Sequence, residues 1–264
     1  MNGSGSLIEA LALGPREHVA LVGGGGKTTL LIALTRELAA NREGVLASTT
    51  TKVRRSEAAQ VESFRLIDEE GSWRERLCQD LDDRRAVFLG RRILDSEKVQ
   101  GVDPALLDDL FMEGHATYII VEADGAAGHP LKAPDSHEPV IPGSVTSVVS
   151  VIGLEALGLP MTTDVVFRAD LFEKVTGARP GDTITGRCIS RLISHPEGLF
   201  KGTPPSSRKI VFLNKEDLVR DREGLEELAH LILSDGDLKV ERVVVGSLTK
   251  KSWEIHERVR QAAD

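Results

Sequence analysis

Short apolar runs alternate along this chain with longer segments in which apolar residues recur every three or four positions. The run from Val19 to Val22 is typical of a buried strand in a parallel sheet. The segment from Thr28 to about Ala40 is typical of a helix with one apolar face. The two patterns alternate along the chain, and this alternation predicts an α/β fold with a mostly parallel sheet and helices on both faces.

The same patterns predict the remaining elements. Further strands are expected over 45–48, 64–67, 86–90, 117–121, 145–152, 209–213 and 240–245. Further helices are expected over 71–81, 104–112, 168–175, 225–233 and 252–263, with one around Ile189 and a helical turn at 7–13. A single domain over 1–264 is predicted, with the charged section at about 64–115 as an insert or lid.

The junction between the first strand and the first helix is rich in glycine. It reads Gly23, Gly24, Gly25, Gly26, Lys27, Thr28 and Thr29. Glycine lets backbone N–H groups approach phosphate oxygens, and a helix start adds unsatisfied N–H groups and partial positive charge. In a P-loop the lysine reaches the β- and γ-phosphates and the next hydroxyl ligates Mg²⁺, roles that we assign to Lys27 and Thr28.

This loop is shorter than the standard P-loop, because Leu21 occupies the position of the usual first glycine. The alternative is a glycine-rich turn with a chance lysine. Since the strand, the glycines, Lys27 and the helix coincide, we favour a nucleotide site. The expected fold is then a P-loop NTPase-like three-layer sandwich, and the domain is a nucleotide-binding domain.

Two carboxylates follow the strand predicted over 117–121, at the edge where open α/β sheets bind their ligands. Glu122 and Asp124 stand at the Walker B position, where a carboxylate holds Mg²⁺ or orients water. If the strand continues through Asp124, both side chains face the site, because residues two apart share a face.

A run of threonines ends the strand predicted over 45–48. Thr50 is a candidate ligand of Mg²⁺, and Thr51 and Lys52 are candidate switch residues at the γ-phosphate. The alternative is a strand end whose hydroxyls bond to the local backbone.

Asn214, Lys215 and Asp217 follow the strand predicted over 209–213 in the pattern Asn-Lys-x-Asp, which is typical of guanine recognition. The carboxylate of Asp217 would accept from guanine N1–H and the exocyclic amine, and adenine lacks both donors in that arrangement. Asn214 would brace the loop, and the stem of Lys215 would cover the base. The expected ligand is therefore GTP with Mg²⁺, with ATP as the alternative.

A proline-rich stretch over 128–142 predicts an extended loop after the two carboxylates. The candidates in it for substrate contacts or for a switch are His129, Lys132, His137 and Glu138. By residue type, His129, Asp135, His137 and Glu138 could also ligate a metal, but their spacing matches no zinc pattern, and lone histidines are more often structural.

Composition narrows the class of partner. The net charge of −8 over 264 residues argues against nucleic acid or an anionic membrane as the main partner. The N-terminus lacks the features of a signal peptide, and no apolar run approaches the length of a membrane span. Cys78 and Cys188 form no Cys-x-x-Cys pair, which fits a reducing cytoplasm.

Taken together, these motifs resemble the YqeC family, accessory proteins for selenium-dependent molybdenum hydroxylases. The segments that carry the resemblance are Val22–Thr29, Thr50–Lys52, Val121–Gly125, Leu131–Pro134, His137–Pro139 and Asn214–Asp217. The resemblance implies a branch of the P-loop GTPases near the dimeric metallochaperones, and with it a homodimer. It also implies a role in making or inserting a selenium-containing molybdenum cofactor for a molybdenum hydroxylase client.

We therefore expect slow GTP hydrolysis that switches the loops at 49–52 and 124–142, with Lys27, Glu122 and Asp124 as catalytic residues. The expected metal ligands come from Thr28, Thr50, Glu122 and Asp124. Two alternatives stay open. One is an ATP-dependent ligase or kinase, because the short glycine loop also resembles that of the Mur ligases. The other is a non-catalytic carrier whose loop holds a pterin or nucleotide phosphate.

Overall fold

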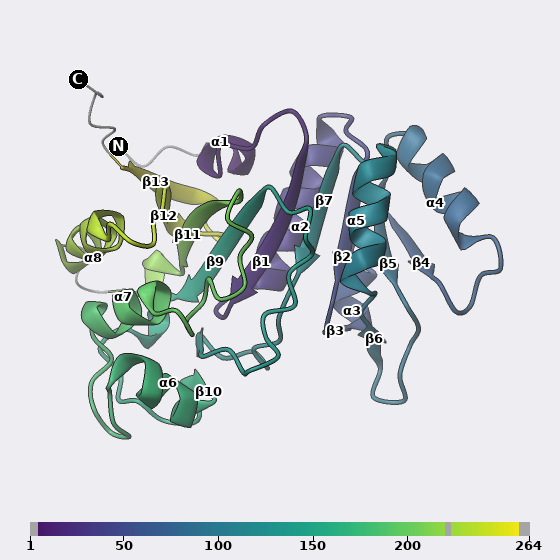
Figure 1. The fold of residues 1–264 in the computed structure, drawn as a ribbon. Helices are drawn as coiled ribbons and strands as arrows, with labels where there is room; N and C mark the ends of the chain where they lie inside the picture. Colours follow the sequence, from purple (N-terminus) through teal and green to yellow (C-terminus); the bar gives the residue numbers. More distant parts are fainter. Residues whose placement is uncertain (1–4, 220–222, 259–264) are drawn as a thin grey trace.

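A nine-stranded sheet forms the centre of the computed structural model, which describes residues 5–219 and 223–258 (Figure 1). Its strands are β1 (Glu17–Gly23), β2 (Val45–Thr49), β4 (Ser63–Leu66), β5 (Ala86–Gly90), β7 (Tyr118–Glu122), β9 (Ser147–Gly153), β11 (Arg208–Asn214), β12 (Arg242–Ser247) and β13 (Ser252–Glu257). They lie in the order β13-β12-β11-β9-β1-β7-β2-β5-β4. Neighbours are parallel, except that β12 and β13 pair antiparallel at one edge.

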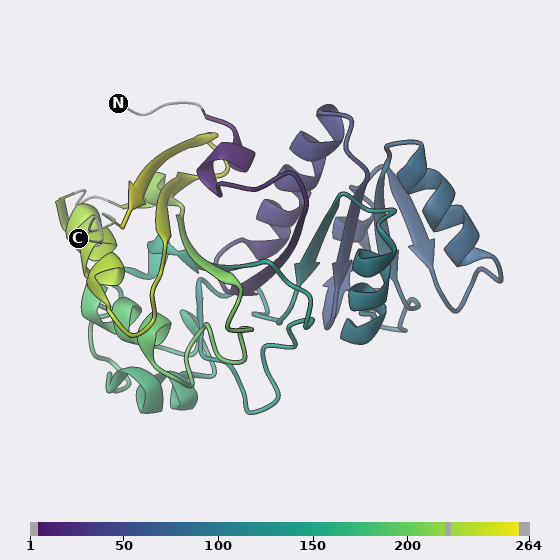
Figure 2. The ribbon, with the colours of Figure 1, turned by 45° about the horizontal axis from the view of Figure 1, so that its top comes forward.

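Helices cover both faces of this sheet, as Figure 1 and Figure 2 show together. One face carries α1 (Leu7–Ala10), α2 (Lys27–Ala40) and α3 (Arg55–Ala58); the other carries α4 (Trp73–Asp82), α5 (Pro104–Glu113), α6 (Ala169–Thr176), α7 (Gly186–Ser194) and α8 (Glu223–Ser234). The short 3-10 turns are η1 (Leu154–Ala156) and η2 (Glu216–Leu218). The predicted three-layer α/β fold is confirmed.

Strand β1 illustrates how the sheet separates two buried apolar clusters. Val19 and Leu21 pack in the cluster under α1 and α2, and Ala20 and Val22 pack in the cluster under α4 to α8. Successive side chains of a strand point to opposite faces, so a strand covered on both faces reads as a continuous apolar run.

Two short ribbons lie beyond the carboxyl ends of the parallel strands, on the lower side of Figure 1. β3 (Lys52–Arg54) pairs antiparallel with β6 (Lys98–Gln100), and β8 (Leu131–Lys132) pairs parallel with β10 (Val166–Phe167). Each ribbon begins close behind a central strand, since β3 follows β2 and β8 follows β7. The sequence did not predict these ribbons, because strands of two or three residues leave almost no periodic signal.

The last helix expected from the sequence is wrong. Residues 252–257 form β13, whose register with β12 pairs Gly246 with Trp253, and residues 259–263 of the expected helix lie outside the described part. Trp253 packs into the apolar cluster, and the backbone pairing of residues 252–257 with β12 makes this segment a strand, although Ile255 is exposed.

The stretch 64–115, suggested as an insert or lid, includes β4 and β5 of the main sheet and the helices α4 and α5 that pack on it. Among the described residues, no helix has the length and apolar character that a membrane crossing requires.

Candidate functional site

The parallel strands all end at one edge of the sheet, and the residues that follow them meet there. Strand β1 lies between β7 and β9 and runs into the phosphate loop, which we define as Gly23–Gly26, and then into α2. The amide of Gly24 donates to the carbonyl of Val151 at 2.9 Å, and that of Gly25 to the carbonyl of His129 at 3.0 Å. The neighbouring strands and loops thus fix the shape of this loop.

Glycine is required in the phosphate loop for steric reasons. Gly25 has φ +70°, and a Cβ there would lie 2.0 Å from the backbone nitrogen of Gly153. Gly26 has φ +128°, and its Cβ would lie 2.5 Å from the side-chain nitrogen of Asn214. Both conformations are poorly tolerated by residues with a side chain, so the glycine run reflects close backbone approach.

The start of α2 offers the amides that remain free. In the described part of the chain, the N–H groups of Gly26, Lys27, Thr28 and Thr29 have no acceptor within the protein. The first N–H groups of a helix lack intrahelical partners and carry its positive partial charge. This helix start, rather than the amides of Gly23 to Gly25, is therefore the part of the loop that suits an anion.

Lys27 lies buried between the two predicted carboxylates. Its Nζ is 3.1 Å from Oδ1 of Asp124 and 3.7 Å from Oε1 of Glu122, and it donates to the carbonyl of Gly23 at 2.5 Å. Burial lowers the pKa of this ammonium, but the charges of Asp124 and Glu122 outweigh burial and raise it. Lys27 is thus held as a cation at the centre of the site.

Thr28 and Glu122 form the pair that best fits a magnesium ion. The hydroxyl of Thr28 donates to Oε2 of Glu122 at 2.9 Å. Burial raises the pKa of Glu122, against the opposing effect of Lys27 and of the Thr28 hydroxyl. A carboxylate and a hydroxyl are the oxygen ligands that Mg²⁺ takes from P-loop proteins.

Asp124 is engaged by the protein on both oxygens. Its carboxylate accepts from the amide of Gly23 at 3.2 and 3.1 Å, and Lys27 and Lys132 each approach one oxygen. The side chains of Asp124 and Lys132 are 1% and 0% exposed. Such a carboxylate orients its neighbours, and Glu122 is the freer of the two for a metal.

The charges continue away from the phosphate loop as a chain of alternating sign, which is buried as far as Glu138 and partly exposed at Arg168 and Asp135. Its members, in order, are Glu122, Lys27, Asp124, Lys132, Glu138, Arg168 and Asp135. Lys132 donates to Glu138 at 2.5 Å and to the carbonyl of Gly125 at 2.6 Å. Burial alone would raise the pKa of Glu138, but Arg168 and Lys132 lower it. The β8–β10 ribbon is thereby tied electrostatically to the phosphate loop.

The threonines after β2 lie beside Glu122 but bond to the protein. Thr49 donates from its hydroxyl to the carbonyl of Glu122 at 2.9 Å, and Thr50 donates to the carbonyl of Val140 at 2.8 Å. The Thr49 and Thr51 hydroxyls lie 3.3 Å apart. The hydroxyl of Thr50 is thus directed at a carbonyl, and Lys52 is exposed on β3.

Asn214 joins the base loop, which we define as Asn214–Asp217, to the phosphate loop. Its side-chain amide donates to the carbonyl of Gly25 at 2.8 Å, and its side-chain oxygen accepts from the amide of Leu248 at 3.1 Å. Lys215 has φ +65° and pairs with Glu155, and Asp217 is exposed on η2. The three predicted residues thus stand at the same sheet edge as Lys27.

Comparison with known proteins identifies the family. The chain matches the YqeC family profile, described as YqeC protein, over residues 19–170. It is 33% identical over 222 residues to the uncharacterized protein YqeC of Escherichia coli (strain K12), and the match covers 80% of this chain and 82% of that protein. This chain belongs to the YqeC family. The predicted resemblance is confirmed.

Solved structures show only a distant likeness to this YqeC family member. FtsY from Mycoplasma mycoides is 13% identical with a TM-score of 0.39, and the match covers 94% of this chain and 67% of that one. The hydrogenase maturation factor HypB from Archaeoglobus fulgidus is 15% identical with a TM-score of 0.40, covering 92% and 87%. Likeness at this level does not bear on function.

The histidines of the proline-rich loop do not form a metal centre. In the described residues, no group of three or more His, Cys, Asp or Glu side chains is placed to hold a metal ion. Both ring nitrogens of His129 face carbonyl oxygens, those of Ala126 and Thr163, at 3.0 Å. His129 therefore fastens this loop, while Lys132 and Glu138 join the buried chain of charges.

Two ion pairs of the site were not foreseen from the sequence of this family member. Arg168 enters through its pairing with Glu138, and Glu155 enters from η1 through its pairing with Lys215. The second oxygen of Glu155 is buried with no partner among the described residues. Glu155 follows the end of β9, so an acidic residue just past a predicted central strand was the available signal.

Proposed function

We propose that this protein binds a nucleotide with Mg²⁺ at the carboxyl end of β1, prefers GTP to ATP, and hydrolyses it slowly. The observation that carries the proposal is the double attachment of Asn214, which links the base loop to the phosphate loop at Gly25 and to Leu248. A phosphate site and a base-reading loop that share one rigid connection suit a single nucleotide.

The phosphates would accept hydrogen bonds from the free amides of Gly26 to Thr29. Lys27 would be the cation that contacts the γ-phosphate during its transfer. Lys27 bonds to the carbonyl of Gly23 and to Asp124. A nucleotide would compete for this ammonium, and a buried, fixed positive charge stabilises the charge that develops on phosphate oxygens.

Magnesium would be held by Thr28 and Glu122, which already contact each other at 2.9 Å. When bound, the ion neutralises charge on the β- and γ-phosphate oxygens. Asp124 would keep Lys27 oriented through its contact at 3.1 Å. We therefore assign metal binding to Glu122 and the positioning of Lys27 to Asp124. Thr50 would be a further metal ligand if its hydrogen bond to the carbonyl of Val140 breaks.

Guanine would be read by Asp217, whose exposed carboxylate is open to a base. Guanine offers two donors to such a carboxylate, and adenine in the same pose offers neither. Lys215 would cover the base with its stem while Glu155 holds its ammonium.

The cellular role that we propose follows the family. Nucleotide turnover would switch the segments at 49–52 and 124–142 and so assist maturation or insertion of a selenium-containing molybdenum cofactor in a molybdenum hydroxylase. The chain of ion pairs from Lys27 to Arg168 supports such coupling, because it connects the phosphate loop with the segment at 124–142. The test is the activity of a client hydroxylase produced with wild-type protein, with Lys27→Ala and without the protein.

The biochemical test is calorimetric titration with GTP and ATP in the presence and absence of Mg²⁺. We expect Asp217→Asn to remove the preference for GTP and the exposed Asp237→Asn to retain it. Thr28→Val should reduce the dependence on Mg²⁺, while Thr29→Val, an exposed neighbour that keeps its amide, should not. Equal binding of both nucleotides by the wild type would contradict guanine reading, and binding of neither would leave the carrier hypothesis.

A further inference from the structure

The β3–β6 ribbon has one apolar face and one cationic face. Val53 and Val99 are 5% and 0% exposed and pack into the core beneath the ribbon. Their neighbours alternate to the outer face, where Lys52 lies opposite Gln100 and Arg54 lies opposite Lys98. Directly opposite residues of an antiparallel pair share a face, so Arg54 and Lys98 stand side by side.

This pairing of like charges is unfavourable in the protein alone. Like charges directly opposite on paired strands destabilise a ribbon. Within the described part of the chain, Lys52, Arg54 and Lys98 have no carboxylate within ion-pair distance, whereas Arg55 pairs with Glu97 at 3.5 Å. An anion placed between Arg54 and Lys98 would remove the repulsion.

An open cleft of about 430 Å³ lies at this cationic face. Its lining residues are Arg54, Arg55, Ser56, Ala59, Ser96, Glu97 and Lys98. The volume falls in the range of small-molecule sites. Three cationic side chains and one carboxylate line it, on a protein whose net charge is −8.

We propose that this cleft binds a small phosphorylated molecule at a site separate from the nucleotide site. The guanidinium of Arg54 offers a planar pair of donors that matches a phosphate, and Lys98 adds a second positive charge from the opposite strand. The hydroxyls of Ser56 and Ser96, which also line the cleft, add hydrogen-bonding groups that suit a phosphate and its ester oxygens. The site needs neither Lys27 nor the base loop, so it stands independently of the function proposed above.

The ribbon is also attached to the nucleotide edge of the sheet. The carbonyl of Thr51 accepts from the amide of Gly101 at 2.7 Å, and the carbonyl of Thr49 accepts from that of Val102 at 2.9 Å. Thr49 in turn donates to the carbonyl of Glu122. The segment Thr49–Thr51 thus links the ribbon that lines the cleft to Glu122, the carboxylate that we propose as a metal ligand.

The test is a titration of the full-length protein with inorganic pyrophosphate, without Mg²⁺ and at low ionic strength, followed through backbone amide NMR shifts. We expect saturable shifts at residues 55–59 and 95–98. Arg54→Ser/Lys98→Ser should weaken them about tenfold or more, because two charge-assisted contacts are lost. Arg54→Lys/Lys98→Arg should retain binding.

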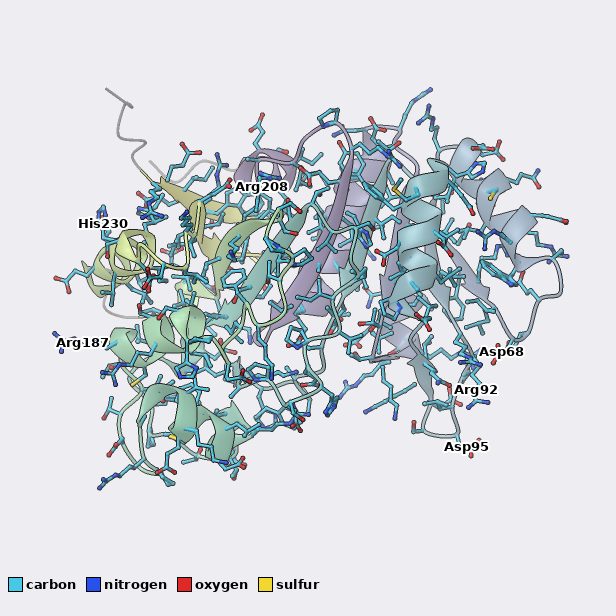
Figure 3. All side chains as sticks on the ribbon, in the orientation of Figure 1. Asp68, Arg92, Asp95, Arg187, Arg208 and His230 are labelled. Atoms are coloured by element: carbon cyan, nitrogen blue, oxygen red, sulfur yellow. The ribbon has the colours of Figure 1, made fainter. Side chains whose placement is uncertain are left out.

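Two controls separate this site from others. Arg187→Ser removes an exposed arginine on the opposite side of the molecule from Arg92 and Asp95, which lie near the ribbon (Figure 3), and should leave the titration unchanged. Lys27→Ala should also leave the shifts at 55–59 unchanged, whatever the fate of nucleotide binding. Shifts confined to Gly26–Thr29, or equal binding by wild type and the double serine variant, would overturn the proposal.

Discussion

Lys27 and Lys132 approach the same buried carboxylate from its two oxygens, each at 3.1 Å from Asp124. One lysine belongs to the start of α2 and the other to β8, so Asp124 connects the phosphate loop with the proline-rich stretch. Desolvating three charges is unfavourable, and their mutual attraction offsets this only while all partners are present. The arrangement makes the site sensitive to the loss of any one of them.

Replacement of Lys132 by methionine should destabilise the protein by about 3 kcal/mol, since it leaves Asp124 and Glu138 each with one cation fewer in a buried setting. The measurement is the free energy of unfolding in urea. Arg55→Met is the control, because Arg55 pairs with Glu97 at the surface, where both side chains are more than half exposed and such pairs contribute roughly 0–1 kcal/mol. Equal losses in the two variants would contradict a structural role for the buried chain.

Replacement of Asn214 by alanine should cost about 1–3 kcal/mol of stability and weaken nucleotide binding, because two backbone groups lose their buried partner. Asp217→Asn is the informative comparison, since Asp217 is exposed and has no such structural task. We expect Asp217→Asn to change base preference at unchanged melting temperature. If the Asn214→Ala protein is as stable as the wild type and binds GTP equally well, Asn214 does not connect the base loop to the phosphate loop in the way that we propose.

The steric requirement at Gly25 separates it from Gly128, which also has a positive φ. Gly25→Ala should prevent the phosphate loop from adopting its observed conformation, because the new Cβ would lie 2.0 Å from the backbone nitrogen of Gly153. Gly128 has φ +85° with nothing within 4 Å of its Cβ position, so Gly128→Ala should cost only the roughly 1–2 kcal/mol of backbone strain. Soluble yield and thermal unfolding of the two variants test the difference.

Stability should fall with acid in part through His18. Burial lowers the pKa of this histidine to about 4, against an opposing effect of Asp108. The unfolded chain takes up the proton near the ordinary value of 6.5 and the folded protein only near 4, so stability is lost as pH falls through this window. Between about pH 7.5 and about pH 5 this amounts to roughly 2 kcal/mol.

The measurement for His18 is urea unfolding at both pH values for the wild type and for His18→Gln. The variant should show a shallower dependence on pH. His230→Gln, at an exposed histidine on α8, should keep the dependence of the wild type. A wild-type slope in the His18 variant would show that other groups dominate acid unfolding.

Sequence predicted the fold well where elements are long and buried. The run Val19–Val22 lies in β1, and the helix expected from Thr28 to about Ala40 is α2, from Lys27 to Ala40. Failure came at the C-terminus, where Trp253 is drawn into the core by pairing with β12. Pairing between strands overrides the local sequence pattern, and that local pattern does not reveal which segments will pair.

For the site, the sequence indicated which residues stand at the strand ends but not how they pair. Glu122 and Asp124 both contact Lys27, although β7 ends at Glu122 and does not extend through Asp124, as the argument from spacing had required. The division of labour between them depends on Lys132, which reaches Asp124 from β8. Contacts between segments far apart in the chain, such as Arg168 with Glu138, are set by the fold and leave no spacing to read.

The hydrogen bonds of Gly24 and Gly25 to Val151 and His129 have a thermodynamic consequence. A loop whose shape is already fixed loses little conformational freedom when a ligand arrives, so binding carries a small entropic penalty. The main cost of binding would then be electrostatic, in drawing Lys27 away from the carbonyl of Gly23. We expect association to be fast and affinity to depend on ionic strength and charge rather than on the ordering of the chain.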